Sequence, residues 1–300
     1  MSAVAFFGAI ETGLLYGFLS LGVYLSFRVL KFPDLTVDGS FPLGAAVTGT
    51  LIVAGWNPFL ATGVAILAGA AAGLCTAILS VRFGILNLLA SILTMIALYS
   101  INLRIMGKPN LSLLNQPSVL APFETLVTKV MANAPLLVMP IVLLTGVGLA
   151  KVLVDAFLNS QLGLAMRATG LNPVMAEAQG INTGRLILLG MALSNGLAAL
   201  SGALFAQLYG FADVTLGVGT VVVGLATVIL GEALLPSGSV VLATLAVVLG
   251  SVLYRVAIAL ALNAGFLGFQ AQDLNLVTAI LVVLALTLPK PSWTRRQASK

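Results

Sequence analysis

Histidine is absent from the chain, and cysteine occurs only once, at Cys75. Histidine is the commonest metal ligand and general base in proteins, so its absence disfavours metal binding and acid–base catalysis. A single cysteine excludes an internal disulfide framework and a metal cluster built from thiolates. The sequence also shows no recognisable nucleophile–base pair, so an enzyme is the least favoured class and we predict no metal site.

Charged residues are scarce: they make up 8% of the chain, against about 25% in a soluble globular domain. Hydrophobic residues make up 60%, and the mean hydropathy is +1.13. This composition predicts an all-α, polytopic membrane protein that forms one transmembrane domain over residues 1–300. The net charge of +5 lies mainly in loops and the tail, so it indicates orientation in the lipid bilayer and disfavours nucleic-acid binding. Because MSAVAFFGAIE lacks a basic flank, we expect this N-terminal stretch to be retained and not cleaved as a signal peptide.

About nine apolar segments are long enough, or nearly so, to cross a bilayer as helices. They are residues 12–27, two spans within 39–81, 83–103, 136–150, 186–208, 217–231, 240–262 and 274–288. The short, glycine-rich segment 217–231 either crosses or re-enters on the same side. Gly69 and Gly73 have the four-residue spacing that permits close helix packing. We also expect a short interfacial helix at Phe123–Met131.

Lysine and arginine predict the orientation, because cytoplasmic loops are enriched in them. If residues 159–185 are cytoplasmic and the spans alternate, only Arg104, Lys108 and Lys129 fall outside, and Arg255 lies within a span. This places the N-terminus outside and the basic tail, residues 290–300, in the cytoplasm. The prediction fails if residues 32–41, taken as a cytoplasmic loop, dip into the membrane without completing a crossing.

Residues 159–185 form a polar segment between two long apolar runs, and it contains the signals of a short helix. Asn172 suits the N-cap, Pro173 the first helical position, and Gly180 the end of the helix. A helix of about two turns is marginal in water, so it is best explained by docking onto a partner. The alternative is an ordinary solvated connection.

The same segment carries a longer pattern, S-x-x-G-x-A-x-R-A-x-G-x-N-P-x-x-A-x-x-x-G-I-N, from Ser160 to Asn182. It resembles the cytoplasmic coupling loop of ABC importer permeases of the branched-chain amino acid type. The small residues Ser201–Leu204 and the run GLATVILGEAL at Gly224–Leu234 also match that family. The stretch FPDLTVDGSFPLGAAV, at Phe32–Val47, resembles the subgroup associated with tryptophan or tyrosine uptake.

The resemblance implies a permease subunit of an ATP-driven importer in the bacterial cytoplasmic (inner) membrane, working by alternating access. Implied partners are ABC ATPase subunits, an extracytoplasmic substrate-binding protein, and a second permease copy, either identical or a close paralogue. The implied substrate is an amino acid, aromatic or branched-chain. The implied coupling residues are Arg167, Asn172, Pro173, Val174, Met175, Glu177 and Gly180.

No G-x-x-x-x-G-K-[ST] phosphate-binding motif occurs in the chain, so we expect ATP and magnesium to bind the partner ATPase and no cofactor to bind here. The alternative function is a stand-alone secondary transporter or channel, driven by an ion gradient through Asp34, Asp38 or Glu11.

Polar residues on apolar segments are the candidates for the transport pathway, because such groups are expensive at membrane depth. The candidate residues are Asp34, Thr36, Asp38, Ser40, Asn87, Ser194 and Asn195. Asp34 and Asp38 either line the pathway or cap the helix that follows, Asp38 at its N-terminus. Arg255 needs a partner, and we favour an intramembrane ion pair with Asp273 over contact with substrate.

Overall fold

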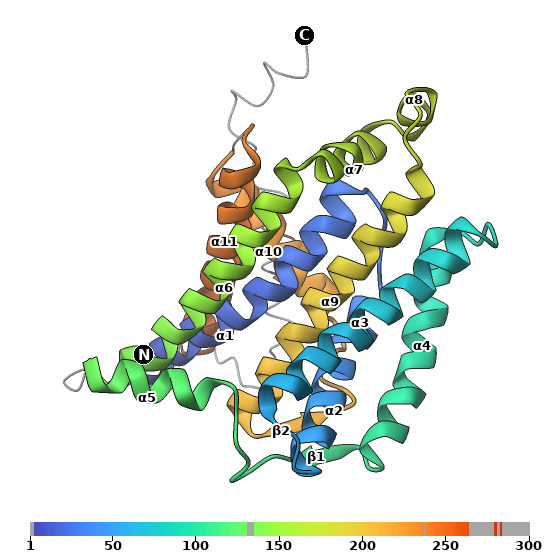
Figure 1. The fold of residues 1–300 in the computed structure, drawn as a ribbon. Helices are drawn as coiled ribbons and strands as arrows, with labels where there is room; N and C mark the ends of the chain where they lie inside the picture. The colour runs from blue at the N-terminus through green and yellow to red at the C-terminus, as the bar shows by residue number, and fades with distance from the viewer. Residues whose placement is uncertain (1–2, 131–134, 237, 264–278, 281–282, 284–300) are drawn as a thin grey trace.

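The computed structural model describes residues 3–130, 135–236, 238–263, 279–280 and 283. Helices dominate this part of the chain (Figure 1). The long ones are α1 (Ala3–Val23), continued by the π-helix η1 (Tyr24–Val29), α3 (Pro58–Val81), α4 (Asn87–Met106), α6 (Pro135–Asn159), α9 (Thr183–Tyr209) and α11 (Val240–Asn263). The shorter elements are α2 (Val37–Val53), α5 (Leu120–Val130), α7 (Gln161–Leu171), α8 (Pro173–Ala178), α10 (Thr220–Leu234) and the strands β1 (Asn110–Ser112) and β2 (Phe211–Asp213).

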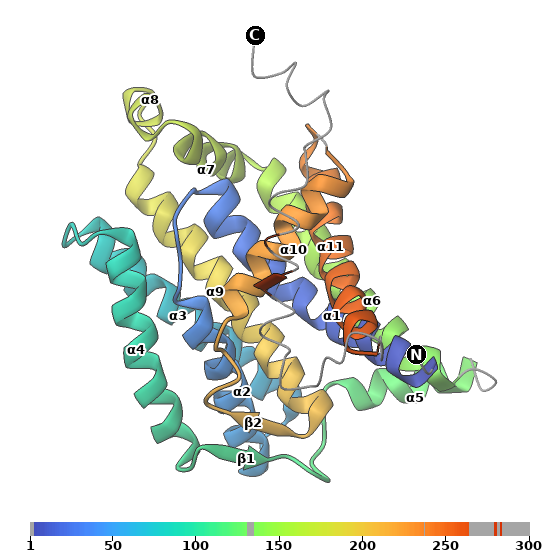
Figure 2. The ribbon, with the colours of Figure 1, turned by 180° about the vertical axis from the view of Figure 1, so that it is seen from behind.

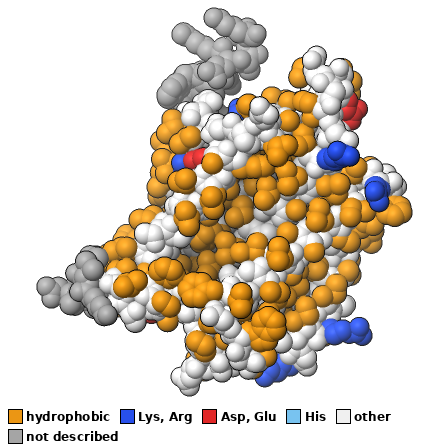
Figure 3. Space-filling model, in the orientation of Figure 1, with side chains coloured by type: hydrophobic (Ala, Val, Ile, Leu, Met, Phe, Trp, Pro, Cys, Tyr) orange, Lys and Arg blue, Asp and Glu red, His pale blue; other side chains and the backbone are white. Residues whose placement is uncertain are grey.

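Within the described residues, 6 helices are long and apolar enough to cross a membrane, and α2 and α10 are shorter apolar helices. These account for eight of the nine predicted segments, and the all-α, polytopic prediction is confirmed. The ninth segment, residues 274–288, falls largely outside the described residues, and the tail 290–300 lies wholly outside them. Hydrophobic side chains cover most of the face shown in Figure 3, and basic side chains lie toward its two ends.

Helix α9 packs against α1, α2 and α3, and small residues let the backbones approach closely. A Cβ at Gly69 or Gly73 would collide with the carbonyl groups of Asn195 and Met191 on α9. The close packing predicted from this glycine spacing is therefore confirmed. The start of α3 also follows the sequence: the Asn57 side chain accepts a 2.9 Å hydrogen bond from the Phe59 amide.

Two crossings of the bundle consist of non-helical chain followed by a short helix, and we call them broken crossings. The first runs from η1 to the end of α2. After η1, residues 30–36 are not helical and run back alongside the bundle to the start of α2 (Figure 1). Thr36 meets Thr76 of α3 through their hydroxyls, 2.7 Å apart, so this stretch lies between helices and not at the end of the bundle. Residues 32–41 are therefore not a simple loop at the end of the bundle. Because α2 completes the crossing, the predicted alternation of the membrane spans is preserved.

The second broken crossing runs from β2 to the end of α10. Residues 214–219 are not helical, and α10 begins at Thr220 after Gly219, whose φ is +82°. The far end of α10 lies beside η1, where Arg28 and Glu232 form an ion pair. The strand β2 lies at the opposite end of the bundle (Figures 1 and 2). The segment predicted at 217–231 therefore crosses the bundle and does not re-enter on one side.

The strand pair β1–β2 and the helix α7 were not predicted, whereas the helix α5 was. β1 and β2 pair antiparallel, with Leu111 opposite Ala212, at the end of the bundle away from α8. Helix α7 was also missed, since the polar segment was expected to hold only one helix. The short helix expected at Phe123–Met131 is present as α5. The start of α1 and the helix α8 lie at opposite ends of the bundle.

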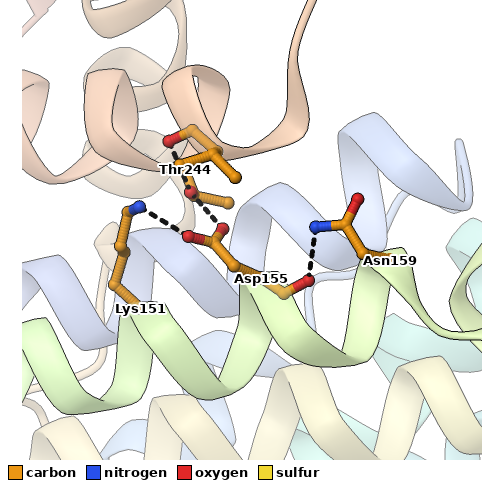
Figure 4. A network of polar contacts seen from close by, with 5 residues as sticks. Lys151, Asp155, Asn159 and Thr244 are labelled. Carbon is orange, nitrogen blue, oxygen red and sulfur yellow. Dashed lines mark hydrogen bonds and ion pairs between the residues drawn. The ribbon is translucent and has the colours of Figure 1, made fainter.

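A polar network joins α6 to α11 (Figure 4). Lys151 donates a hydrogen bond to one carboxylate oxygen of Asp155, and the Thr244 hydroxyl donates to the other. Asn159 donates from its side chain to the Asp155 carbonyl, one turn away. The Lys151 and Asp155 side chains are only 15% and 10% exposed, so this ion pair within α6 is largely buried. The Thr244 hydroxyl links it to α11.

Candidate transport pathway and coupling site

Four of the predicted pathway residues meet in one buried network beside the non-helical stretch 30–36. Asn195 of α9 donates a 2.7 Å hydrogen bond to Asp34, and Ser40 donates a 2.7 Å bond to the Asn195 side-chain oxygen. The Thr36 amide donates to the other oxygen of Asp34 at 2.9 Å. All four side chains are fully buried. This network ties the unwound segment to the middle of α9.

Asp38 caps a different helix from the one predicted. It lies in the first turn of α2, yet its carboxylate accepts hydrogen bonds from the Val221 amide at 2.7 Å, the Thr220 hydroxyl at 2.8 Å and the Gly219 amide at 3.3 Å. These donors form the N-terminus of α10, so of the two alternatives considered for Asp38, capping of α2 is wrong. A carboxylate is favoured here because helix N-termini carry partial positive charge and unpaired amides.

A pocket of about 370 Å³ adjoins this junction. It is lined by Asp38 and Gly39 of α2, by Tyr99 and Asn102 of α4, and by residues 214 and 218 ahead of α10. Of the seven predicted pathway residues, Asp38 alone is among the residues that line it. The pocket volume falls within the range of about 300–1,000 Å³ typical of small-molecule sites.

The other predicted pathway residues have different surroundings. Ser194 donates a 2.7 Å hydrogen bond to the Gly22 carbonyl and joins α9 to α1. Asn87 lies at the start of α4 and accepts a hydrogen bond from Ser80 of α3. These contacts hold helices together, and the structure does not bring either residue into the pocket of Asp38.

Arg255 lies over an aromatic ring. Its guanidinium carbon is 3.8 Å from the centre of the Tyr16 ring, a cation–π contact between α11 and α1. Its Nε has no hydrogen-bond partner within the part of the chain that the structure describes. The predicted partner, Asp273, lies outside the described residues, so the ion pair stays a prediction.

The predicted coupling segment folds as two helices at one end of the bundle (Figures 1 and 2). Helix α8 has the predicted ends: Asn172 accepts a 3.0 Å hydrogen bond from the Met175 amide, Pro173 is the first residue, and Gly180 has a φ of +80°. Helix α7 packs against α6, α9 and η1. Helix α8 therefore projects at the end of the bundle, next to α7, which packs on the membrane helices.

The exposed surface of α8 includes two large apolar side chains. Val174 is 76% and Met175 is 50% exposed, while Ala176 is buried on the opposite side. Glu177 accepts a 2.6 Å hydrogen bond from the Thr183 hydroxyl, so this acid stabilises the connection to α9. Arg167 is half-buried on α7. The exposed pair Val174 and Met175 is the part of α8 best placed to contact another protein.

The chain was compared with protein families and with known proteins. The family model described as "Branched-chain amino acid transport system / permease component" matches residues 5–287. The chain belongs to this permease family. It is the permease subunit of an ABC-type importer, ATP hydrolysis belongs to a separate subunit, and the chain itself is not an enzyme. Membership in the family implies ATPase and binding-protein partners and a multi-pass membrane location.

Two curated relatives resemble the permease over most of its length. The "Tyrosine transport system permease protein" of Clostridioides difficile is 41% identical, over 90% of this chain and 86% of the relative. The "Uncharacterized protein RP368" of Rickettsia prowazekii is 39% identical, over 70% of this chain and 71% of the relative. The solved structure titled "PsaBC from Streptococcus pneumoniae in complex with Fab" has a TM-score of 0.50 at 18% identity and covers 98% of this chain and 94% of that chain. The last match concerns the fold alone.

Sequence reasoning missed every pocket-lining residue of the permease except Asp38. Tyr99 and Asn102 of α4 were not among the predicted pathway residues. Thr220 gave no signal, because only the folded chain brings it to Asp38. The available hint was a cluster of polar groups within about one turn of an apolar helix, at Tyr99, Ser100 and Asn102.

Proposed function

We propose that the permease carries an aromatic amino acid, with tyrosine as the first candidate, into the cytoplasm. The observation that carries this proposal is the relative named for tyrosine transport, 41% identical over 90% of the chain. The pocket beside Asp38 agrees with it, since apolar and aromatic side chains of Met95, Ile96 and Tyr99 form one wall. Branched-chain substrates are the second candidate, supported by the description of the matching family.

The assembly we propose follows from the two ends of the bundle. The end with α7 and α8 faces the cytoplasm, and two ATPase subunits, which carry ATP and magnesium, contact α8 there. The end with β1, β2 and α5 faces outward and receives a substrate-binding protein. The N-terminus is then outside and the C-terminus cytoplasmic, in agreement with Arg28, Arg82 and Arg185 at the end with α8. A second permease copy, identical or paralogous, completes the pathway.

The proposed mechanism is alternating access. ATP-driven closure of the ATPases moves α8, and α7 passes the movement to η1, α6 and α9, against which it packs. Because η1 is paired with α10 through Arg28 and Glu232, movement at the cytoplasmic end reaches the broken crossing. The α2–α10 junction is then exposed alternately to the outside and to the cytoplasm. Asp34, Thr36, Ser40 and Asn195 hold the unwound segment in place.

The test is uptake of radiolabelled L-tyrosine by proteoliposomes that contain the permease, its ATPase and its binding protein, with ATP inside. We expect ATP-dependent uptake that unlabelled tyrosine and phenylalanine suppress and leucine does not. Suppression by leucine and valine, with no effect of phenylalanine, would reassign the permease to branched-chain substrates. Uptake by the permease alone, driven by an ion gradient, would contradict the importer assignment.

A further inference from the structure

The pocket between α2 and α4 contains an amide with an unused hydrogen-bond acceptor. Asn102 is fully buried, and its Nδ2 donates a 3.2 Å hydrogen bond to the Gly39 carbonyl. Its Oδ1 has no hydrogen-bond partner within the described residues. The Gly39 carbonyl is only an acceptor, so the nitrogen of Asn102 must face it and the oxygen must face the other way. A buried acceptor of this kind is costly unless a donor arrives to meet it.

Asp38 adds negative charge to the same pocket. Its carboxylate accepts hydrogen bonds from the Gly219 amide, the Thr220 hydroxyl and the Val221 amide at the start of α10. No lysine or arginine lines the pocket among the residues that the structure describes. The polar side of the pocket thus offers acceptors and a carboxylate, the surroundings that suit a cationic donor group.

The opposite side of the pocket is apolar. Ile96 and Tyr99 of α4 and Val218 ahead of α10 line it, and all three side chains are more than half exposed. Surface of this kind suits the side chain of an apolar or aromatic solute, while the acceptors hold its polar end. The two sides together match a solute that has an ammonium group next to an apolar side chain.

We propose that this pocket is a binding site for the ammonium end of the transported amino acid, with the Asn102 Oδ1 and the Asp38 carboxylate as acceptors. The apolar side chain lies against Ile96, Tyr99 and Val218. The inference deepens the proposed function and rests on it for the identity of the solute. Since Asp38 also holds the N-terminus of α10, ammonium binding acts directly on the junction of the two broken crossings. Asn102 is then the specificity-determining residue, because its oxygen has no other partner in the part of the chain that the structure describes.

The test uses a reporter thiol in the pocket of the full transporter. Cys75, the one native cysteine, is replaced by serine, and Ser100, which lines the pocket, is replaced by cysteine. The rate of maleimide labelling is measured in the permease–ATPase complex without the binding protein. The probes are L-tyrosine, tyramine, which keeps the ammonium, and 3-(4-hydroxyphenyl)propionate, which lacks it.

We expect L-tyrosine and tyramine to slow the labelling and the desamino compound to have no effect. Replacing Asn102 with leucine should raise the concentration for half-maximal protection by tyramine about tenfold, the effect of losing one hydrogen bond to a charged group. Asn87→Leu, a matched change on the same helix outside the pocket, should leave protection unchanged. Retained ATPase binding shows that each variant is folded.

Equal protection by all three probes, or protection that Asn102→Leu does not weaken, would overturn the ammonium site. Tyrosine uptake by the wild-type transporter with no protection of the thiol by L-tyrosine or tyramine would overturn the site alone. Failure of tyrosine uptake, together with protection by tyramine that Asn102→Leu weakens, would instead overturn the proposed substrate and leave the ammonium site standing.

Discussion

The Asp38 carboxylate and the Thr220 hydroxyl lie 2.8 Å apart, although 182 positions separate them in the sequence. Each residue stands at the start of a short helix that completes a crossing begun by non-helical chain. The two broken crossings are therefore joined at their helix N-termini, inside the bundle. Non-helical backbone at membrane depth is tolerated where protein buries it or where it lines a cavity, and the pocket beside Asp38 meets that condition.

Removing the Asp38 cap should destabilise the permease in a graded way. Asp38→Ala strands the donors of α10 and should lower its free energy of unfolding by about 1–2 kcal/mol. Asp38→Asn should cost less, because asparagine is also a good cap. The measurement is the thermal unfolding midpoint of the purified permease, with Thr220→Val as the control that removes one hydroxyl donor. Equal midpoints for Asp38→Ala and wild type would contradict the capping role.

The Lys151–Asp155 pair of α6 should show the behaviour of a buried ion pair. Among the described residues, Lys151→Met leaves the Asp155 carboxylate with the Thr244 hydroxyl alone, and we expect a loss of about 3–5 kcal/mol. The double variant Lys151→Met/Asp155→Leu should be closer to wild type, because it leaves no buried charge. Denaturant unfolding in detergent measures both. A double variant that is less stable than Lys151→Met would refute this account.

Stability near β2 should fall at acid pH because of Asp213. Although partial burial raises its pKa, hydrogen bonds from the Thr215 hydroxyl and amide and from the Asn110 side chain lower the pKa of Asp213 below the usual 3.8. A lowered folded pKa stabilises the fold above pH 3.8, and this contribution is lost as the pH falls through the folded pKa. Amide hydrogen exchange of β1 and β2 should quicken in that range in wild type but not in Asp213→Asn. The same acid response in both chains would exclude this cause.

Local signals predicted the short helix α8 well. Asn172, Pro173 and Gly180 fix the ends of α8 through backbone capping, which depends on neighbours in sequence. Long apolar runs predicted the membrane helices, because hydropathy is also a local property of the sequence. The broken crossings were not predicted, because hydropathy does not tell helix from buried non-helical chain. Asp38 caps α10 and not α2, which was the helix considered from the sequence. The sequence could not show this, because Thr220 is distant from Asp38 along the chain.

Other parts of the candidate site also depend on tertiary contacts. Asp34, Ser40 and Asn195 were chosen separately as polar residues, and only the fold shows that one network joins them. The sequence gives equally little sign that the Asn102 oxygen lacks a partner among the described residues. The helix α7 was missed because it packs on membrane helices that sequence periodicity cannot place.

Coupling through α8 is tested most directly by measuring L-tyrosine uptake and ATP hydrolysis together in the assembled transporter. The variant is Val174→Asp/Met175→Asp, which changes two exposed side chains and should not disturb folding. The control, Gln179→Asp, adds a charge just beyond the same helix. We predict that the variant loses uptake and ATPase co-purification while its unfolding midpoint matches wild type, and that the control keeps all three. Normal uptake with both exposed apolar residues replaced would contradict the account.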